Sequence, residues 1–320
     1  MNLSIQPINS LSEPAQLFQA ARSLQRSRVG ALLYRAQQLV SGLLAPSMNE
    51  ANLTLGQIEV LAGACAAPFQ DQITLAKYLG IDRSSITSLV DMLESKSLIE
   101  RSAHQDRRRR LLAASDLGHA ALEHILPHRD AVAAQVMAAL GEDGEDFLTR
   151  LRRLGENSAS NATPWLCPAD PQSIDHPEYL DAVYRHPSFL IRRAFQVAMA
   201  IFTEEAQAYG VNPMHYTILT LLAKNYVSDQ SELIRVTDVN KSVMILLLNR
   251  LEKRGFLRRA TFENDRRRKI LSLTDDGQRL AAALNTCVAR YERRFFQPLR
   301  ADEQHMMMEN LRCLTDNLAP

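Results

Sequence analysis

The chain has 320 residues, of which 46% are hydrophobic, and its formal net charge at pH 7 is +1. This length and hydrophobic content suffice for two domains with packed cores, while the near-zero charge excludes a polyanion-binding surface spread over the whole molecule. No apolar run is long enough to span a membrane, the N-terminus lacks the pattern of a secretory signal, and the four cysteines are too few for a disulfide framework, so we expect a cytoplasmic protein.

The first part of the chain is predicted to hold two helices. Residues 1–27 form an N-terminal extension that is polar at its start and then helical, with Pro14 in the first turn of the helix, where proline is tolerated. The second helix covers 28–44 and is expected to end near Pro46, because proline interrupts the helical hydrogen-bond pattern.

Three further helices follow in close succession, as in a helix-turn-helix. Short helices are predicted over 55–65 and 73–79, and Gly80 is well placed to end the second of them. A helix that starts after Asp82 completes the motif. Its apolar residues recur at i, i+3, i+4 and i+7: Ile86, Leu89, Val90 and Leu93. Its other side carries small hydroxyl residues, which let a helix approach a partner closely: Ser84, Ser85, Thr87 and Ser88.

A basic hairpin is predicted directly after this helix. Residues 98–101 and 110–114 have the composition of two short strands, and the polar loop between them contains Arg107 and Arg108. A single charged run of this kind is more often a solvated loop than a binding site. The order of helix and hairpin, however, occurs twice in this chain.

An internal repeat spans most of the sequence. With an offset of 158, residues 28–101 align without a gap to 186–259, and one insertion makes the offset 159 in the hairpin that follows. The second hairpin again carries a basic run, which includes Arg266 and Arg267. Because a chance charge cluster has no reason to keep its place relative to a second one, the two hairpins favour contact with the phosphates and the narrow minor groove of a DNA duplex.

These segments resemble the MarR family of winged helix-turn-helix transcription regulators. The similarity rests on an Asp-x-Arg signature in each hairpin, at Asp106 and Asp265, and on the Ser/Thr-Asp-x-Gly start of the following helix, at 115–118 and 274–277. The resemblance implies a mainly α-helical fold with small β-wings, duplicated in tandem. It implies two domains, 28–154 and 188–320, and the prolines of 155–187 indicate a linker of little regular structure between them.

Members of this family are usually homodimers, so the resemblance implies that the two copies form an intrachain pseudo-dimer on double-stranded DNA. Two recognition helices would then enter successive major grooves, and the wings would enter the flanking minor grooves. The residues implied for DNA binding are Arg83, Ser84, Ser85, Thr87, Ser88, Arg107, Arg108, Lys241, Ser242, Arg266 and Arg267, with Asp106 and Asp265 supporting the wings. Because no homodimer symmetry constrains the copies, the operator is free to be asymmetric, and whether two such chains pair further stays open.

The second copy departs from the family pattern in its recognition helix. Val243, Ile245 and Leu246 stand where the first copy has hydroxyl residues. Apolar contact with thymine methyl groups explains such a helix, and so does packing against another protein. Two functions therefore remain: a DNA-binding transcription regulator, expected to be a repressor, and as the alternative a protein-interaction module with one degenerate DNA-binding lobe.

Many members of the family are repressors released by small aromatic or phenolic acids, or by thiol oxidation. The resemblance places such an effector at the junction between the interface helices and the DNA-binding lobe. The side chains suited to a carboxylate or phenol there are Arg35, Arg193, His186, His215 and Tyr216. For each one singly, a structural role is the more frequent explanation. Cys65 and Cys287 lie on apolar helices, as buried inert thiols do, and Cys167 in the linker is the more reactive candidate.

Neither a metal site nor an enzyme is expected. His124 and His128 have the i, i+4 spacing of metal ligands, but Pro127 lies between them and no carboxylate or cysteine was found to complete a set. The sequence also lacks a phosphate-binding glycine loop, a nucleophile elbow and a zinc-protease motif, so no cofactor is implied.

Overall fold

The computed structural model describes most of the chain: residues 14–103, 110–158, 162–165, 174–262 and 265–319. In the two hairpins it describes the backbone but not the side chains at a few strand positions: 103, 110, 261–262 and 265–269. The sections below concern these described residues.

The chain packs as two compact units, and each is described by itself. The first-lobe unit consists of Leu32–Ala198 and Phe295–Pro320, and the second-lobe unit consists of Met1–Ala31 and Met199–Arg294. The boundaries between the units fall inside helices. Each unit therefore combines residues from both sequence repeats.

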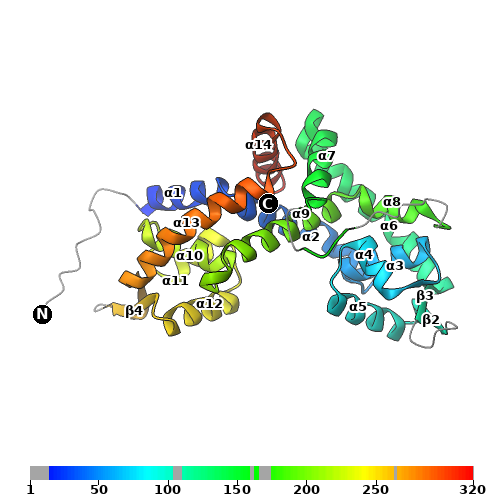
Figure 1. Ribbon diagram of the computed structural model, residues 1–320, viewed down its shortest axis with the longest axis horizontal. Helices are drawn as coiled ribbons and strands as arrows, with labels where there is room; N and C mark the ends of the chain where they lie inside the picture. The colour runs from blue at the N-terminus through cyan, green and yellow to red at the C-terminus, as the bar shows by residue number, and fades with distance from the viewer. Residues whose placement is uncertain (1–13, 104–109, 159–161, 166–173, 263–264, 320) are drawn as a thin grey trace, which may run out of the picture. The chain divides into compact units, whose positions relative to one another are not determined.

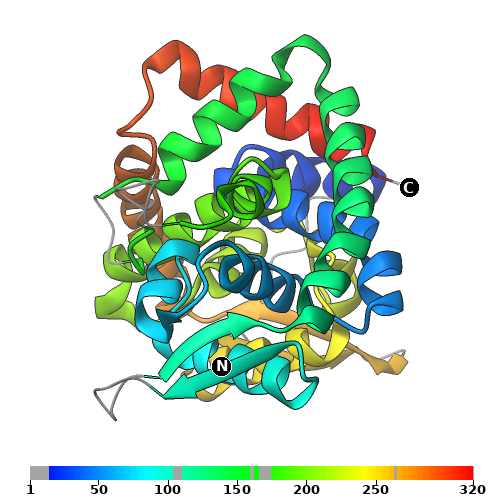
Figure 2. The ribbon, with the colours of Figure 1, turned by 90° about the vertical axis from the view of Figure 1, so that its right-hand side faces the viewer.

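The first-lobe unit contains a winged helix-turn-helix, the first lobe, at 55–114 (Figure 1). Its elements are α3 (Leu55–Ala66), β1 (Gln70–Asp71), α4 (Gln72–Leu79), α5 (Arg83–Ser95), β2 (Ile99–Ala103) and β3 (Arg110–Ala114). The strands pair antiparallel in the order β1-β3-β2, and the β2–β3 hairpin is the wing (Figure 2, teal). The predicted helix, hairpin and helix-turn-helix are confirmed for this lobe.

Side-chain caps set the helix boundaries of the first lobe. Thr54 and Gln57 form a reciprocal capping box at the start of α3, and Asp71 accepts backbone N–H groups at the start of α4. Gly80 ends α4 in the left-handed conformation with φ 59°, which glycine adopts without strain. Asp82 then caps α5, so the connection between α4 and α5 is short and fixed at both ends.

Two long helices run through a proline. α2 (Val29–Glu50) continues past Pro46, so the expected end near that residue is wrong, and α6 (Asp116–Leu140) continues past Pro127. Proline leaves unpaired the carbonyl group four residues earlier, but both prolines and both of those residues are exposed, so water replaces the lost donor. Among the described helices, these two included, none has the length and apolar character needed to cross a membrane.

The predicted linker contains a helix, α8 (Pro177–Tyr184), with proline at its first position. This helix packs on α3, and the Tyr184 hydroxyl donates to the Tyr78 carbonyl oxygen over 2.9 Å. The buried Trp165 ring lies edge-on to the Tyr184 ring, with centroids 5.5 Å apart. The expectation of little regular structure is therefore wrong for this part of the linker, because its apolar side chains gain burial by forming a helix against the first lobe.

Three more helices complete the first-lobe unit: α7 (Gly144–Gly155), most of α9 (Pro187–Glu205) and α14 (Ala301–Asn317). α14 packs against both α6 and α7. Arg150 donates from Nη2 to Asn310 Oδ1 over 2.8 Å, and Arg153 pairs with Glu303 over 2.6 Å. Residues from the C-terminal end of the chain thus cover helices of the first repeat.

The second-lobe unit contains the second winged helix-turn-helix, the second lobe, at 213–273. Its elements, with the helices around them, are α1 (Pro14–Arg26), α10 (Pro213–Ala223), α11 (Gln230–Thr237), α12 (Lys241–Lys253), β4 (Leu257–Phe262), β5 (Asp265–Leu273) and α13 (Asp275–Phe295) (Figure 1). The β4–β5 hairpin is the second wing, and its register shifts between Thr261 and Phe262. The tandem duplication of the winged helix-turn-helix is therefore confirmed.

The two lobes repeat each other's contacts where the wing passes into the next helix. A Cβ atom on Gly118 would lie 2.2 Å from a backbone carbonyl oxygen, and one on Gly277 would lie 1.9 Å from the equivalent oxygen. The Gly118 N–H donates to Ser115 Oγ and the Gly277 N–H donates to Thr274 Oγ1, both over 3.1 Å. The Ser/Thr-Asp-x-Gly signature therefore combines a helix cap with a close approach that only glycine permits.

Candidate functional site

The start of α5 is organised by Asp82. Its carboxylate accepts the backbone N–H groups of Ser84 and Ser85 over 3.0 and 2.9 Å, and their hydroxyl protons over 2.5 and 2.6 Å. These four hydrogen bonds hold the pKa of Asp82 well below its usual range. The carboxylate is therefore ionised at neutral pH and fixes both serine side chains against the helix start.

The other hydroxyl groups on the exposed face of α5 also donate within the protein. Thr87 Oγ1 donates to the Arg83 carbonyl oxygen over 2.9 Å and accepts from Gln72 Nε2 over 2.6 Å, and Ser88 Oγ donates to the Ser84 carbonyl oxygen over 3.3 Å. With their protons engaged, these hydroxyl oxygens suit donors on base edges better than phosphates, which need donors. Arg83, exposed at the first position of α5, is the member of this set that suits a phosphate.

An ion pair links the wing to the recognition helix in each lobe. Arg101 on β2 pairs with Asp91 and Glu94 of α5, and the distance from its Nη1 to the Glu94 Oε2 is 2.9 Å. Arg259 on β4 pairs with Glu252 of α12 over 3.2 Å. The arginines occupy equivalent positions in the repeat, as do Glu94 and Glu252. Each pair therefore fixes the direction of a wing relative to the helix that it flanks.

The wing tips lie mostly outside what the structure describes. The predicted residues of the first tip are in the segment that is not described: Asp106, Arg107 and Arg108. The predicted residues of the second tip lie on β5, with the backbone described and the side chains not: Asp265, Arg266 and Arg267. Their roles at the minor groove and in wing support remain predictions.

The second recognition helix, α12, begins in the same way as α5. The side chain of Asn240 caps it by accepting the Ser242 N–H over 2.8 Å. Lys241 then occupies the position that Arg83 has in the first lobe, and both side chains are exposed. The two helix starts thus present the same order of cap and cation.

The exposed face of α12 also carries three large apolar side chains, as the sequence predicted. Val243, Ile245 and Leu246 are 47%, 37% and 59% exposed, and we call these three residues the α12 patch. The opposite face fills the core of the lobe with other aliphatic side chains: Met244, Leu247, Leu248 and Leu251. The patch therefore does not contribute to the packing of the second lobe.

The first-lobe unit places three arginines, two of them buried and one half-buried, near one buried acid. Arg129 on α6 is 1% exposed, and its three guanidinium nitrogens have no hydrogen-bond partner among the residues that the structure describes. Arg192 on α9 donates to Glu59 Oε2 over 2.8 Å, and Arg193 donates from Nε to the Gly155 carbonyl oxygen over 3.0 Å. Burial lowers the pKa of Arg129, and it lowers the pKa of Arg193 to about 10. We call Arg129, Arg192, Arg193 and Glu59 the arginine cluster.

The arginine cluster carries excess positive charge in an apolar setting. Glu59 is fully buried, and its charge acts on Arg129 while it is also paired with Arg192. Removing an unpaired ion from water costs several kcal/mol, so buried charges are ordinarily matched. The Arg192 guanidinium lies 5.0 Å from the centre of the Phe189 ring, and the Trp165 ring lies edge-on at 5.1 Å from the same ring. The cluster therefore combines excess positive charge with neighbouring aromatic rings.

His186 has a structural role beside this cluster. Its Nδ1 accepts the Ser188 N–H over 3.1 Å, so Nε2 carries the proton and donates to the Arg129 carbonyl oxygen over 3.0 Å. Burial and the nearby Arg129 charge lower the pKa of His186 to about 3, which keeps the imidazole neutral. Both ring nitrogens are used within the protein, and the ring holds α6 to the start of α9.

The other predicted effector residues are divided between the units. Arg35 is half-buried on α2 in the first-lobe unit, whereas His215 and Tyr216 lie on α10 in the second-lobe unit. His215 Nδ1 accepts the Asn212 N–H over 3.2 Å, and burial lowers the pKa of His215 to about 4. The buried Tyr216 hydroxyl donates to Asn285 Oδ1 over 3.2 Å. The remaining two of the five candidates lie at the arginine cluster.

Arg129 and Glu59 were not among the residues predicted from the sequence, although the sequence around each carries a signal. Arg129 falls on the buried stripe of α6 between Ile125 and Val132. Glu59 lies in α3 between two buried apolar residues. A charged residue on a buried stripe needs a partner inside the fold or in a ligand. That rule would have selected both residues from the sequence.

The thiols behave as the sequence predicted where the structure describes them. Cys65 and Cys287 are each 1% exposed, and burial raises the pKa of Cys65 to about 12. Cys313 on α14 is exposed. Cys167 lies outside the described residues. The two buried thiols are therefore inert at neutral pH.

Comparison with known proteins gives two matches to models of the MarR family, at residues 53–110 and 209–268, one in each lobe. The HTH-type transcriptional repressor NicR of Pseudomonas putida is 26% identical over 159 residues, which are 96% of that protein and 50% of this chain. A putative transcriptional regulatory protein for the hcr operon of Thauera aromatica is 33% identical over 119 residues, 69% of that protein and 37% of this chain. Among solved structures, the PcaV transcriptional regulator from Streptomyces coelicolor in complex with its natural ligand is 29% identical and gives a TM-score of 0.38, covering 41% of this chain and 92% of that chain. Half of this chain is thus enough to match nearly all of NicR.

Proposed function

Because the chain belongs to the MarR family of transcription regulators, we propose that it is a sequence-specific DNA-binding repressor in which a single chain supplies both winged helix-turn-helix lobes as a pseudo-dimer. The repeat domains of this proposal are residues 28–154 and 188–320, joined by 155–187. Each lobe engages one half of an operator, and the halves differ because the two recognition helices differ. The names of the relatives, which are transcriptional regulators and repressors, support this class of function.

A matched pair of exposed cations is the observation that carries this proposal. Arg83 and Lys241 each stand at the first position of a recognition helix, directly after a side-chain cap. The start of a helix presents backbone N–H groups and a positive dipole, so a cation there is well placed for a DNA phosphate. The same arrangement in both lobes supports a contact from each of them.

The test starts from operator sequences selected from a random duplex pool with the purified full chain. Fluorescence anisotropy then compares the wild type with Arg83→Ala and Lys241→Ala. We expect each substitution to weaken binding by about tenfold or more and to lower the slope of log affinity against log salt by about 1. Arg185→Ala, at a side chain that is 79% exposed beyond the end of α8, is the control and should leave affinity unchanged.

The outcomes separate the lobes. A loss in both variants supports one phosphate contact from each recognition helix. A loss in Arg83→Ala alone means that the second lobe does not grip the duplex, and the single-chain pseudo-dimer is then wrong. Failure of the pool selection to enrich any sequence overturns the proposal as a whole.

We also propose that the arginine cluster binds a small aromatic carboxylate, which releases the DNA. The support is the buried guanidinium of Arg129, which has no hydrogen-bond partner among the described residues, together with the rings of Phe189 and Trp165. A carboxylate that accepts from Arg129 would give this buried charge the partner that it lacks among the described residues. The ring of the same ligand would stack beside the existing aromatic side chains.

A panel of benzoate and hydroxybenzoates tests this proposal by calorimetry with the full chain. Binding of at least one member to the wild type, weakened by about tenfold or more in Arg129→Met, is the expected result. Arg185→Ala again serves as the control. Equal binding of the acid to Arg129→Met and to the wild type would place the effector elsewhere. The proposal would also be wrong if none of these acids weakened the binding of DNA to the wild type.

A second candidate function rests on the α12 patch. Contiguous exposed apolar groups more often mark a protein contact than a DNA reader, which favours a protein-interaction role for the second lobe. Leu246→Ser distinguishes the two. Weaker and less selective binding to thymine-containing operator positions indicates contact with methyl groups, whereas unchanged DNA binding indicates that the patch serves another partner.

A further inference from the structure

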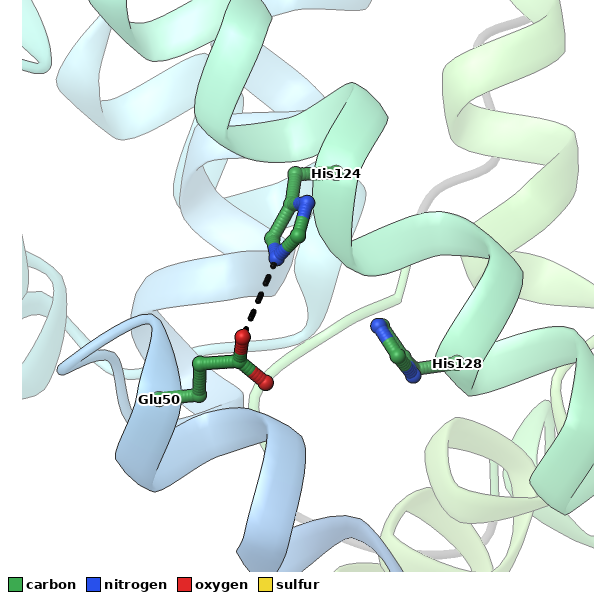
Figure 3. A group of neighbouring side chains, drawn as sticks. All are labelled: Glu50, His124 and His128. Carbon is green, nitrogen blue, oxygen red and sulfur yellow. Dashed lines mark ion pairs between the residues drawn. The ribbon is translucent and has the colours of Figure 1, made fainter.

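One group of side chains in the first-lobe unit has no part in the function proposed above. His124 and His128 project from successive turns of α6, and Glu50 projects toward them from the last position of α2 (Figure 3). Their nearest ligand atoms all lie within 4.8 Å of one another. His124 Nε2 is 3.7 Å from Glu50 Oε1, and the two imidazole rings are 5.7 Å apart at their centres.

Two features of the sequence speak against a metal at this histidine pair, and the fold removes both. The first was that no carboxylate or cysteine completes the set, but the fold brings Glu50 to the pair from another helix. The second was that Pro127 separates the histidines, but α6 is continuous from Asp116 to Leu140 and keeps both rings on one face. Neither premise holds in the folded chain.

We propose that Glu50, His124 and His128 bind a divalent transition-metal ion, with Zn²⁺ as the best fit. Two imidazole nitrogens and one carboxylate oxygen are a known ligand set of zinc sites with three protein ligands, in which a water molecule takes the fourth position. Tetrahedral ligands about 2.0–2.1 Å from zinc lie roughly 3.3 Å apart, so the present spacing has to contract. All three side chains are exposed, and they close this gap by rotation without repacking the core.

A metal ion at this site would tie two helices together. It would join the end of α2 to α6, whose first turn is capped by Ser115 directly after the wing strand β3. Glu50 and the two histidines are far apart in sequence and come together only in the folded chain. An ion that binds all three therefore binds the folded form and not the unfolded chain, and so it stabilises the first-lobe unit. The expected signature is a rise in Tm with added Zn²⁺.

The experiment uses the full chain freed of metal with a chelator. Calorimetric titration with Zn²⁺ should reveal a site that is weakened about tenfold or more in His128→Ala and in Glu50→Gln. The same variants should lose the Zn²⁺-dependent rise in Tm. His305→Ala, which removes an exposed histidine on α14 outside this group, should keep both responses.

Co²⁺ supplies a second readout because its spectrum differs between nitrogen or oxygen ligands and thiolates. Absorption that lacks a thiolate-to-cobalt band in the wild type, and that disappears in His128→Ala, supports the site. Two results overturn it: no Zn²⁺ binding by the wild type, or binding that survives His128→Ala and Glu50→Gln and is lost only when thiols are alkylated. None of these measurements involves DNA, so the result is independent of the proposed function.

Discussion

Arg129→Met is expected to make the protein more stable, although it removes a charged residue from the interior. The guanidinium of Arg129 is 1% exposed and its three nitrogens have no hydrogen-bond partner among the described residues. Methionine is unbranched and flexible, so it fills most of the same space without a charge. The folded chain no longer has to keep an unpaired ion away from water.

The magnitude follows from the cost of leaving a buried polar group unsatisfied, about 1–3 kcal/mol. The free energy of unfolding should rise by an amount in that range, because the nearby charge of Glu59, which acts on Arg129 but is paired with Arg192, offsets part of the penalty. The pKa of Arg129 is lower in the folded state than its ordinary value, so the penalty applies at every pH below that folded pKa. The gain should therefore be the same across the neutral range.

Arg192→Met is the matched comparison, and the expected sign is opposite. Arg192 pairs with Glu59 over 2.8 Å, and Glu59 is fully buried. Removing this partner leaves a buried carboxylate without its hydrogen-bond donor, which costs about 3 kcal/mol or more. The two variants change neighbouring arginines to the same residue, so a general effect of methionine cannot explain opposite signs.

Urea denaturation followed by fluorescence of the single tryptophan gives both free energies, since Trp165 is buried in the same unit. The opposite result would be a free energy of unfolding that is about 2 kcal/mol or more lower in Arg129→Met than in the wild type. It would show that Arg129 has a partner that stabilises the fold. In that case the anion site proposed at the arginine cluster would lose its main support.

Three other predictions follow from the packing. Gly118→Ala and Gly277→Ala should each lower the free energy of unfolding by about 2 kcal/mol or more, because the added Cβ meets a carbonyl oxygen. Gly42→Ala, which has open space around the added atom, should raise the free energy of unfolding slightly. Equal effects of the three substitutions in urea titrations would contradict this. Asp82→Ala should cost about 1 kcal/mol at pH 7. Because the pKa of Asp82 is depressed in the folded state, this contribution is complete above the ordinary carboxyl range and is lost as the pH falls below it. The free energies of unfolding of the wild type and the variant should therefore converge in acid, and a constant difference between them would contradict the prediction. Among the described cysteines, iodoacetamide should modify Cys313 before Cys65 and Cys287, as read by peptide mass spectrometry, and early labelling of Cys65 would contradict its burial.

The sequence was sufficient for features whose partners are local or repeated. The end of α4 at Gly80, the helix start after Asp82 and the exposed α12 patch could all be predicted because spacing along one helix or turn determines them. The Ser/Thr-Asp-x-Gly signature at Gly118 and Gly277 was a feature of the family resemblance. The repeat added information that one copy lacks. Equivalent residues in the two lobes, such as the wing arginines that pair with recognition-helix glutamates, make equivalent contacts.

The sequence was not sufficient where a partner comes from a distant segment. Glu59 and Arg192 meet only because α3 packs near α9, and Glu50 reaches His124 only because α2 ends beside α6. The predicted helix end at Pro46 was wrong for a different reason. The rule that proline ends a helix assumes that the lost hydrogen bond has no replacement, and this fails on a face that water reaches.

The packing of α14 on α6 and α7 bears on how such a chain can evolve. Arg150 and Arg153 of the first repeat rely on Asn310 and Glu303 near the end of the chain. Deleting the second repeat would remove these partners and expose the apolar surface beneath them. The first repeat would therefore not fold as an isolated domain after a simple truncation. Once the two copies share a core, the exposed residues of each copy can change without loss of stability. Loss of either whole copy would destabilise the other.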